Sequence, residues 1–324
     1  MDFKHIFSGI ALSTLLFCMG CDGDDAKSDS GRKNYKIGIS IPTADHGWTG
    51  GVVYFANVAQ QKIEQDNKDV KVVVSSARDA AEQVDRLENL LVQNVDAIVV
   101  LPQEPAPLTA VCEKIKSKGI KLIVVDRGLT KDVQDLSVVG DNPGFGEAAA
   151  KAIAEELKGE GKLVIMEGVP CAVNSDRVDA FKKYMQKYPE IEILDSQSAY
   201  WDTEKGLKLM ENYLQKHPKI DAVWTGDDDV LLGALKAYQE SGRKDVKLFV
   251  GGGGSKNIIK KIMDKDPAVR LTVTYPPQMI LVAAEQAVKL IKNQAVPADK
   301  RLVVPAEVIT FENAADNYYP DSAY

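Results

Sequence analysis

The sequence has few of the residues on which covalent catalysis and metal binding depend. Its 324 residues include only four cysteines and three histidines. Neither Cys112 nor Cys171 has a Cys or His neighbour at the spacing of metal ligands, and their positions in different predicted domains argue against a disulfide. No nucleophile elbow, hydride-cofactor fingerprint or His paired with a Ser or Cys signature is present. We therefore predict no catalytic residue, no metal and no cofactor.

An excess of positive charge is also missing. The chain carries 40 Lys and Arg against 47 Asp and Glu, a formal net charge of −7. Such an acidic chain lacks the electrostatic footprint of a nucleic-acid-binding protein. After residue 20 no apolar run approaches the length of a membrane-spanning helix. With 45% hydrophobic residues, the chain can fill the core of one large domain or two of ordinary size.

The N-terminal stretch indicates export. Residues 3–20 form a short apolar run that ends in a small residue before Cys21, as in a signal sequence. Residues 16–21 resemble a bacterial lipobox, which would make residues 1–21 a lipoprotein signal and Cys21 the lipid-bearing residue. An ordinary cleaved signal peptide is the alternative. Residues 22–34 are polar and predict a flexible tether. We expect a protein anchored to the outer face of the cytoplasmic membrane, or periplasmic.

From residue 35 on, apolar strand-like runs alternate with helical periods. Residues Val52, Ala56, Ala59 and Ile63, for example, share one helix face. Continuous Val/Ile/Leu runs are typical of parallel strands that are covered on both faces. The alternation predicts an α/β chain, and ten such runs are more than one sheet holds comfortably, so we expect two similar domains. The predicted strands are residues 36–41, 70–75, 97–101, 122–125, 136–139, 163–166, 191–194, 222–224, 248–250 and 271–274.

The segments that follow these strands are rich in aromatic, carboxylate and Arg side chains. In open parallel sheets, ligands bind beyond the carboxyl ends of the strands. Aromatic rings stack on a polyhydroxylated ligand, and carboxylates and Arg hydrogen-bond to it. The segments are residues 43–48, 126–127, 171–177, 200–202, 226–229, 251–254 and 275–277.

The order and spacing of several short motifs resemble the ribose- and galactose-type periplasmic sugar-binding proteins that feed ABC transporters. The motifs are residues 36–40, 126–127, 140–142, 201–202, 227–228, 232–235 and 275–278. The resemblance implies the type I periplasmic-binding-protein fold: two doubly wound parallel-sheet lobes, joined by a three-segment hinge, with the sugar between them. The chain would cross between lobes near Gly140, Tyr275 and Val304. The N-terminal lobe would hold residues 35–140 plus 276–304, and the C-terminal lobe residues 141–275 plus 305–324.

The resemblance also implies several ligand contacts. Trp48 and Trp201 stand where the family places aromatic rings on both faces of the sugar. His46 stands where the family has an amide or carboxylate, and Asp227 where it usually has Asn. Each could hold a hydroxyl group of the ligand.

Other site positions follow from the residues themselves. Adjacent Asp126 and Arg127 after an apolar strand supply an acceptor and donors for neighbouring hydroxyls. Arg177 is either a ligand contact or a residue of the helix surface or an ion pair. The family resemblance further implies that Ser175 stands where relatives often carry an Arg that binds the ligand, and that Tyr275 adds bulk that takes volume from the site. The predicted ligand is therefore a small neutral sugar or polyol: a pentose, a deoxyhexose or a short polyol.

Two further motifs have competing interpretations. The three carboxylates of residues 227–229 could suggest a metal, but the spacing of a calcium loop is absent, and one of them more plausibly caps a helix that begins near Val230. The glycines of residues 251–254 could suggest phosphate binding, but they match neither the P-loop nor the dinucleotide pattern. Gly253 stands where the family usually has an Asp for the ligand.

The expected function is that of a monomeric solute receptor that presents its ligand to the membrane subunits of an ABC permease. A receptor that reports to a signalling partner, or an exported enzyme on the same fold, is the alternative. A transcription regulator would need a basic helix-turn-helix ahead of the core, where residues 1–34 offer a signal and a tether.

Overall fold

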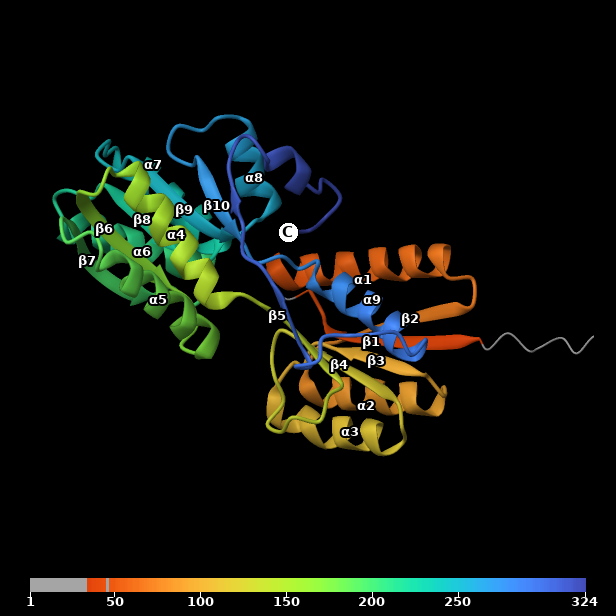
Figure 1. The fold of residues 1–324 in the computed structure, drawn as a ribbon. Helices are drawn as coiled ribbons and strands as arrows, with labels where there is room; N and C mark the ends of the chain where they lie inside the picture. The colour runs from red at the N-terminus through yellow and green to blue at the C-terminus, as the bar shows by residue number, and fades with distance from the viewer. Residues whose placement is uncertain (1–33, 45–46) are drawn as a thin grey trace, which may run out of the picture. The chain divides into compact units, whose positions relative to one another are not determined.

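The computed structural model describes residues 34–44 and 47–324. Cys21 and His46 lie outside the described residues, so what the sequence predicts for them stays a prediction. Within the described part, strands and helices alternate along the chain, and the strands form two six-stranded sheets (Figure 1).

The first sheet is parallel throughout and has the strand order β11-β5-β4-β3-β1-β2. Helices α1 (Gly47–Asp66) and α9 (Met279–Ile291) cover one face, and α2 (Ala80–Val92) and α3 (Pro105–Ser117) cover the other. Its strands are β1 (Tyr35–Pro42), β2 (Val70–Ala77), β3 (Ala97–Val100), β4 (Lys121–Val125), β5 (Leu136–Gly140) and β11 (Arg301–Val304).

The second sheet has the order β12-β10-β9-β8-β6-β7, parallel except for the β10–β12 pair. Helices α4 (Asn142–Glu156) and α5 (Ala172–Met185) pack on one face. The other face carries three helices, which are α6 (Thr203–Lys216), α7 (Asp228–Ser241) and α8 (Lys256–Met263). Its strands are β6 (Gly161–Glu167), β7 (Ile191–Ser198), β8 (Ala222–Thr225), β9 (Leu248–Gly253), β10 (Leu271–Thr274) and β12 (Val308–Ile309). A 3-10 turn, η1 (Ala314–Asn317), follows β12.

Covering both faces explains why central strands such as β3 are apolar at every position. In β3, Ala97 and Val99 pack toward α1 and α9, while Ile98 and Val100 pack toward α2 and α3. Successive side chains of a strand point to opposite faces, so a sheet covered on both sides needs apolar residues in continuous runs.

The chain passes between the two sheets three times. It leaves the first sheet after β5 at Gly140, returns after β10 at Thr274, and leaves again after β11 at Val304. These are the three places at which the sequence predicts crossings. The predicted fold class of two doubly wound parallel-sheet lobes joined by three segments is confirmed. The exact bounds of the two predicted domains stay a prediction.

All ten predicted strands are present, and the predicted helix face of Val52, Ala56, Ala59 and Ile63 is buried in α1. The sequence did not predict β11 and β12. These are short strands at the sheet edges, and β11 alternates exposed and half-buried residues, which carries little hydrophobic signal.

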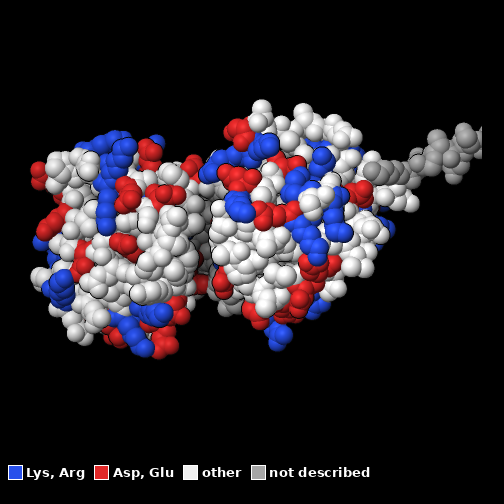
Figure 2. Space-filling view, turned by 90° about the horizontal axis from the view of Figure 1, so that it is seen from below, with Lys and Arg blue, Asp and Glu red and all other residues white. Residues whose placement is uncertain are grey.

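The described residues include no helix that combines the length and the apolar character needed to cross a bilayer. Acidic and basic side chains are interspersed over the face shown in Figure 2. That mixture agrees with a net charge of −7 spread over the chain rather than gathered in one patch.

Candidate functional site

Tyr275 follows β10 at the second crossing. It forms hydrogen bonds with a residue after β4 and with a residue of α1. Its hydroxyl donates to Oδ1 of Asp126, which follows β4, at 2.5 Å. Its carbonyl accepts a hydrogen bond from Nε1 of Trp48, in the first turn of α1, at 2.9 Å. The rings of Trp48 and Tyr275 lie 5.8 Å apart between centroids. The structure thus brings together three predicted site residues that are far apart in sequence.

The backbone of Asp126 is held in an uncommon conformation. Its φ is +59°, in the left-handed region that non-glycine residues seldom adopt, and its amide donates to the carbonyl of Val138 at 2.9 Å. Its side chain is 8% exposed, whereas that of Arg127 is 35% exposed. Arg127 donates to the carbonyl of Gln103 at 3.1 Å and lies 3.8 Å from the Asp126 carboxylate. Arg127 therefore lies at the margin of the Tyr275 network.

Arg177, on α5, is the second connecting residue and is only 6% exposed. Its Nε donates to Oδ1 of Asn142 at 2.9 Å, and Nη1 donates to the carbonyl of Gly226 at 3.0 Å. The guanidinium lies 4.3 Å from the ring centroids of both Phe145 and Tyr275. Of the interpretations that the sequence left open, the helix-surface one is wrong, because Arg177 is a buried cation that lies over two aromatic rings.

Asp227 and Asp228 hold protein groups at the start of α7. Asp227 Oδ1 accepts from the backbone amides of Asp229 at 2.7 Å and Val230 at 3.4 Å, so the predicted helix cap is confirmed. Burial, then the charges of Asp229 and Asp228, raise the pKa of Asp227 well above its ordinary value, while Arg177 lowers it.

Asp228 is fully buried between two neighbouring segments. Its carboxylate accepts from the amide of Ser255 at 2.6 Å and from Oγ1 of Thr272 at 3.0 Å. Burial raises the pKa of this carboxyl to about 7. In the part of the chain that the structure describes, no group of His, Cys, Asp and Glu could hold a metal ion.

Trp201 follows β7 in the chain and lies beside the same network. It also has a left-handed backbone, with φ +55°, and its ring centroid lies 6.0 Å from the Arg177 guanidinium. The indole lies so close to Gly168 that a Cβ there would be 2.0 Å from Nε1. This Nε1 is buried, and among the described residues it has no hydrogen-bond partner. Ser175, in contrast, is exposed on α5, and the structure does not bring it into the network.

Two residues of the network were not predicted as site residues. Asn142 and Phe145 both lie in the first turn of α4, just after the first crossing. The sequence did indicate Asn142, because it is a polar residue that follows the carboxyl end of β5, as Asp126 follows that of β4. Phe145 had no such signal, because an aromatic residue in a helix is usually part of the core.

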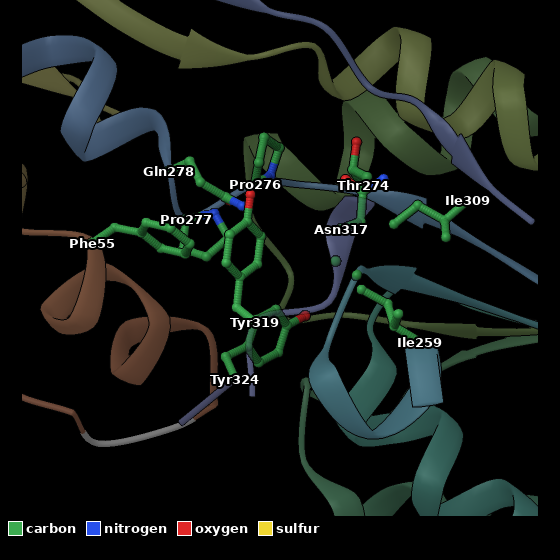
Figure 3. A pocket seen from close by; sticks show the side chains of 12 residues that line it. Phe55, Ile259, Thr274, Pro276, Pro277, Gln278, Ile309, Asn317, Tyr319 and Tyr324 are labelled. Atoms are coloured by element: carbon green, nitrogen blue, oxygen red, sulfur yellow. The ribbon is translucent and has the colours of Figure 1, made fainter. Parts of the chain in front are cut away.

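A pocket adjoins the second crossing (Figure 3). Its walls come from α1, the ends of β9 and β10, the segment after β10, α8, β12 and the C-terminal segment. The lining residues are Phe55, Gly253, Gly254, Ile259, Thr274, Pro276, Pro277, Gln278, Ile309, Asn317, Tyr319 and Tyr324.

Known proteins are similar to this chain in sequence and in architecture. The chain is 32% identical over 265 residues to the ribose import binding protein RbsB of Bacillus subtilis, covering 80% of this chain and 83% of that one. It is 28% identical over 297 residues to a xylitol-binding protein of Mycolicibacterium smegmatis, covering 90% and 81%.

Among solved structures, the chain is similar to an ABC transporter periplasmic solute binding protein from Actinobacillus succinogenes with bound D-allose. The TM-score is 0.76 at 26% identity, over 87% of this chain and 99% of that one. Residues 37–295 match the family described as the periplasmic binding protein domain. The chain belongs to the periplasmic binding protein family.

Proposed function

We propose that this protein is the solute-binding component of an ABC importer and that it binds one small neutral sugar or sugar alcohol. The observation that carries the proposal is the buried network in which Tyr275 joins Asp126 and Trp48, and Arg177 joins Asn142 and Phe145. It combines flat apolar rings with a few oriented polar groups. This is the composition that recognises a ring with several hydroxyl groups.

The charges favour a neutral ligand. Asp126 presents a carboxylate that repels an anionic ligand at short range. Arg177 offsets part of this negative charge, but its Nε and Nη1 already donate to protein acceptors. A ligand with no net charge meets neither repulsion nor an unpaired buried charge.

The small size of the ligand follows from the number of site polar groups that already form hydrogen bonds with protein atoms. The hydroxyl of Tyr275 is bonded to Asp126, and Asp227 caps α7. Few polar groups therefore remain for ligand hydroxyls, and each hydroxyl without a partner would weaken binding. A pentose, a deoxyhexose or a short polyol fits these constraints.

The proposed mechanism is closure of two lobes about the three connecting segments. A ligand that contacts residues from both sheets only in the closed state shifts the population toward that state. The closed form would then be presented to the permease. Relatives named for ribose and xylitol support this proposal, and family members are binding proteins rather than enzymes.

Thermal unfolding with a panel of candidate solutes tests the proposal. The panel contains D-ribose, D-xylose, L-fucose, xylitol, erythritol, and, as controls, amino acids and nucleosides. A ligand at about a hundredfold excess over Kd adds roughly 2.7 kcal/mol to folding stability and raises Tm by several degrees. A response limited to amino acids or nucleosides, or no response at all, contradicts the assignment.

A further inference from the structure

The segment after η1 is anchored against the second sheet's helices rather than left loose. Lys256, at the start of α8, donates from Nζ to the carbonyls of Pro320 at 3.2 Å and Ser322 at 2.5 Å. Ser322 is 2% exposed. This anchoring directs Tyr324 inward, where only 6% of the residue is exposed.

Three glycines make room for the Tyr324 side chain (Figure 3 shows its position beside Pro277 and Tyr319). A Cβ on Gly253, at the end of β9, would lie 1.7 Å from the Tyr324 hydroxyl oxygen. A Cβ on Gly47 would lie 2.8 Å from Cδ2, and one on Gly51 would lie 3.1 Å from Cβ of Tyr324. Such distances are shorter than van der Waals contact, so the ring occupies space that side chains on α1 and β9 would otherwise fill.

This position borders the candidate site. Gly47 precedes Trp48 in the chain, and the Asp229 carboxylate lies 2.8 Å from the Cβ position of Gly47. Burial, with the charges of Asp227 and its neighbours, raises the pKa of Tyr324 well above its ordinary value, while Arg177 lowers it. The hydroxyl is therefore a neutral donor, and it donates weakly to the carbonyl of Gly252 at 3.4 Å.

We propose that Tyr324 is a specificity-determining residue of the solute site and that its ring limits the size of the sugar that the site accepts. The inference rests on the proposed function. The ring fills the end of the site at β9, where Gly253 has no side chain of its own. The position of the ring also explains Gly253, because this glycine makes room for the tyrosine and need not bind a phosphate.

The test compares ligand ranking rather than binding strength alone. Tyr324→Leu keeps apolar burial but does not reach Gly253, and Tyr324→Phe keeps the ring without its hydroxyl. Calorimetry would use D-ribose, xylitol, D-allose and D-glucose. For Tyr324→Leu we expect the ratio of hexose to pentose affinity to rise at least tenfold, the effect of one methylene-sized change in a pocket. Tyr324→Phe should keep the wild-type ranking.

Two controls separate the ring from general damage. Tyr319→Leu changes another tyrosine of the segment, which packs edge-on against Phe55 at 5.0 Å between centroids, and should leave the ranking unchanged. Gly253→Ala should displace the Tyr324 ring and shift the ranking as Tyr324→Leu does. Gly254→Ala introduces similar backbone strain, at φ +80° against +114°, with no atom closer than 3.4 Å, and should not shift it.

The outcomes are distinct. An unchanged ranking in Tyr324→Leu, with affinity altered equally for all sugars or not at all, overturns the inference and leaves the proposed function intact. If wild type binds none of the sugars while Tyr324→Leu binds a hexose, the size limit is supported. If neither protein binds any sugar, both the inference and the proposed function are overturned.

Discussion

At the scale of single residues, Arg177 is the side chain on which the site depends most. It is buried and joins Asn142, the Gly226 carbonyl and two aromatic rings. A hydrogen bond to a charged group contributes about 1.5–3 kcal/mol, and removing one partner leaves the others buried without a donor. Arg177 is therefore both a structural and a site residue.

We predict that Arg177→Ala lowers the free energy of unfolding by about 2–4 kcal/mol and abolishes solute binding. Arg177→Lys should recover only part of this stability, because one ammonium group cannot reproduce the two directed hydrogen bonds of the guanidinium. Urea unfolding of the free protein measures the first effect. Arg127→Ala is the matched control, because Arg127 is at the margin of the network; it should unfold like wild type and lose roughly tenfold in affinity. Equal stability of Arg177→Ala and wild type would contradict the structural role.

Asp228 predicts a pH dependence of stability. Its pKa is raised to about 7 in the folded protein, against an ordinary value near 3.8, so the folded state holds this proton more tightly than the unfolded state does. Stability from this group is therefore greatest below about pH 4 and is lost as pH rises to about 7. Each pKa unit corresponds to about 1.4 kcal/mol, which makes the total loss on the order of a few kcal/mol.

Asp228→Asn should remove this loss. An Asn oxygen can accept from the Ser255 amide, and its NH₂ can donate to the Thr272 hydroxyl, which reverses the present Thr272 hydrogen bond but keeps both partners paired. We expect the variant to be more stable than wild type at pH 8, with a smaller difference at pH 4.5, in urea unfolding at both values. A stability difference that does not change with pH would show that Asp228 does not titrate in this range.

At the scale of elements, the close packing of α4 on α5 sets the distance between Asn142 and Arg177. Gly146 lies at the contact, and a Cβ there would be 2.0 Å from the carbonyl oxygen of Arg177 and 3.1 Å from the amide of Phe181. Both contacts are with backbone atoms, which cannot rotate away. The helices can approach this closely only because residue 146 has no side chain.

We predict that Gly146→Ala forces α4 and α5 apart, destabilises the protein by about 1–3 kcal/mol and weakens solute binding. Gly128→Ala is the control, since no atom of the other described residues, its two chain neighbours aside, lies within 4 Å of a Cβ at that position. Thermal unfolding and calorimetry of the two variants give the comparison. Normal binding by Gly146→Ala would mean that the Asn142–Arg177 contact does not position the site.

At the scale of the whole molecule, we propose that Cys21 anchors the exported protein to the membrane through a lipid. The proposal depends on the short apolar run that ends before Cys21 and on its lipobox-like motif. Labelling of cells with a radioactive fatty acid should mark wild type and leave Cys21→Ser unmarked. Both proteins should still be exported. Equal labelling of the two would exclude the anchor and favour an ordinary cleaved signal peptide.

Much of the architecture could be predicted from the sequence because it depends on local patterns. Strands covered on both faces must be apolar throughout, so runs such as residues 97–101 indicated the parallel sheets directly. The carboxyl ends of parallel strands meet at one edge, which is why Asp126 and Tyr275 could be named as site residues before their contact was known.

The partners of these residues were decided only by the tertiary structure. The Tyr275–Asp126 hydrogen bond spans 149 residues, and the position of Tyr324 against Gly253 depends on the packing of the C-terminal segment. Arg177 had three interpretations because a helix pattern does not show whether a cation meets solvent, a carboxylate or the ligand site. Local sequence determined which elements form and where their polar ends lie. Long-range packing determined which side chains meet, because a contact between distant segments depends on the residues at both ends and leaves no periodic pattern in either.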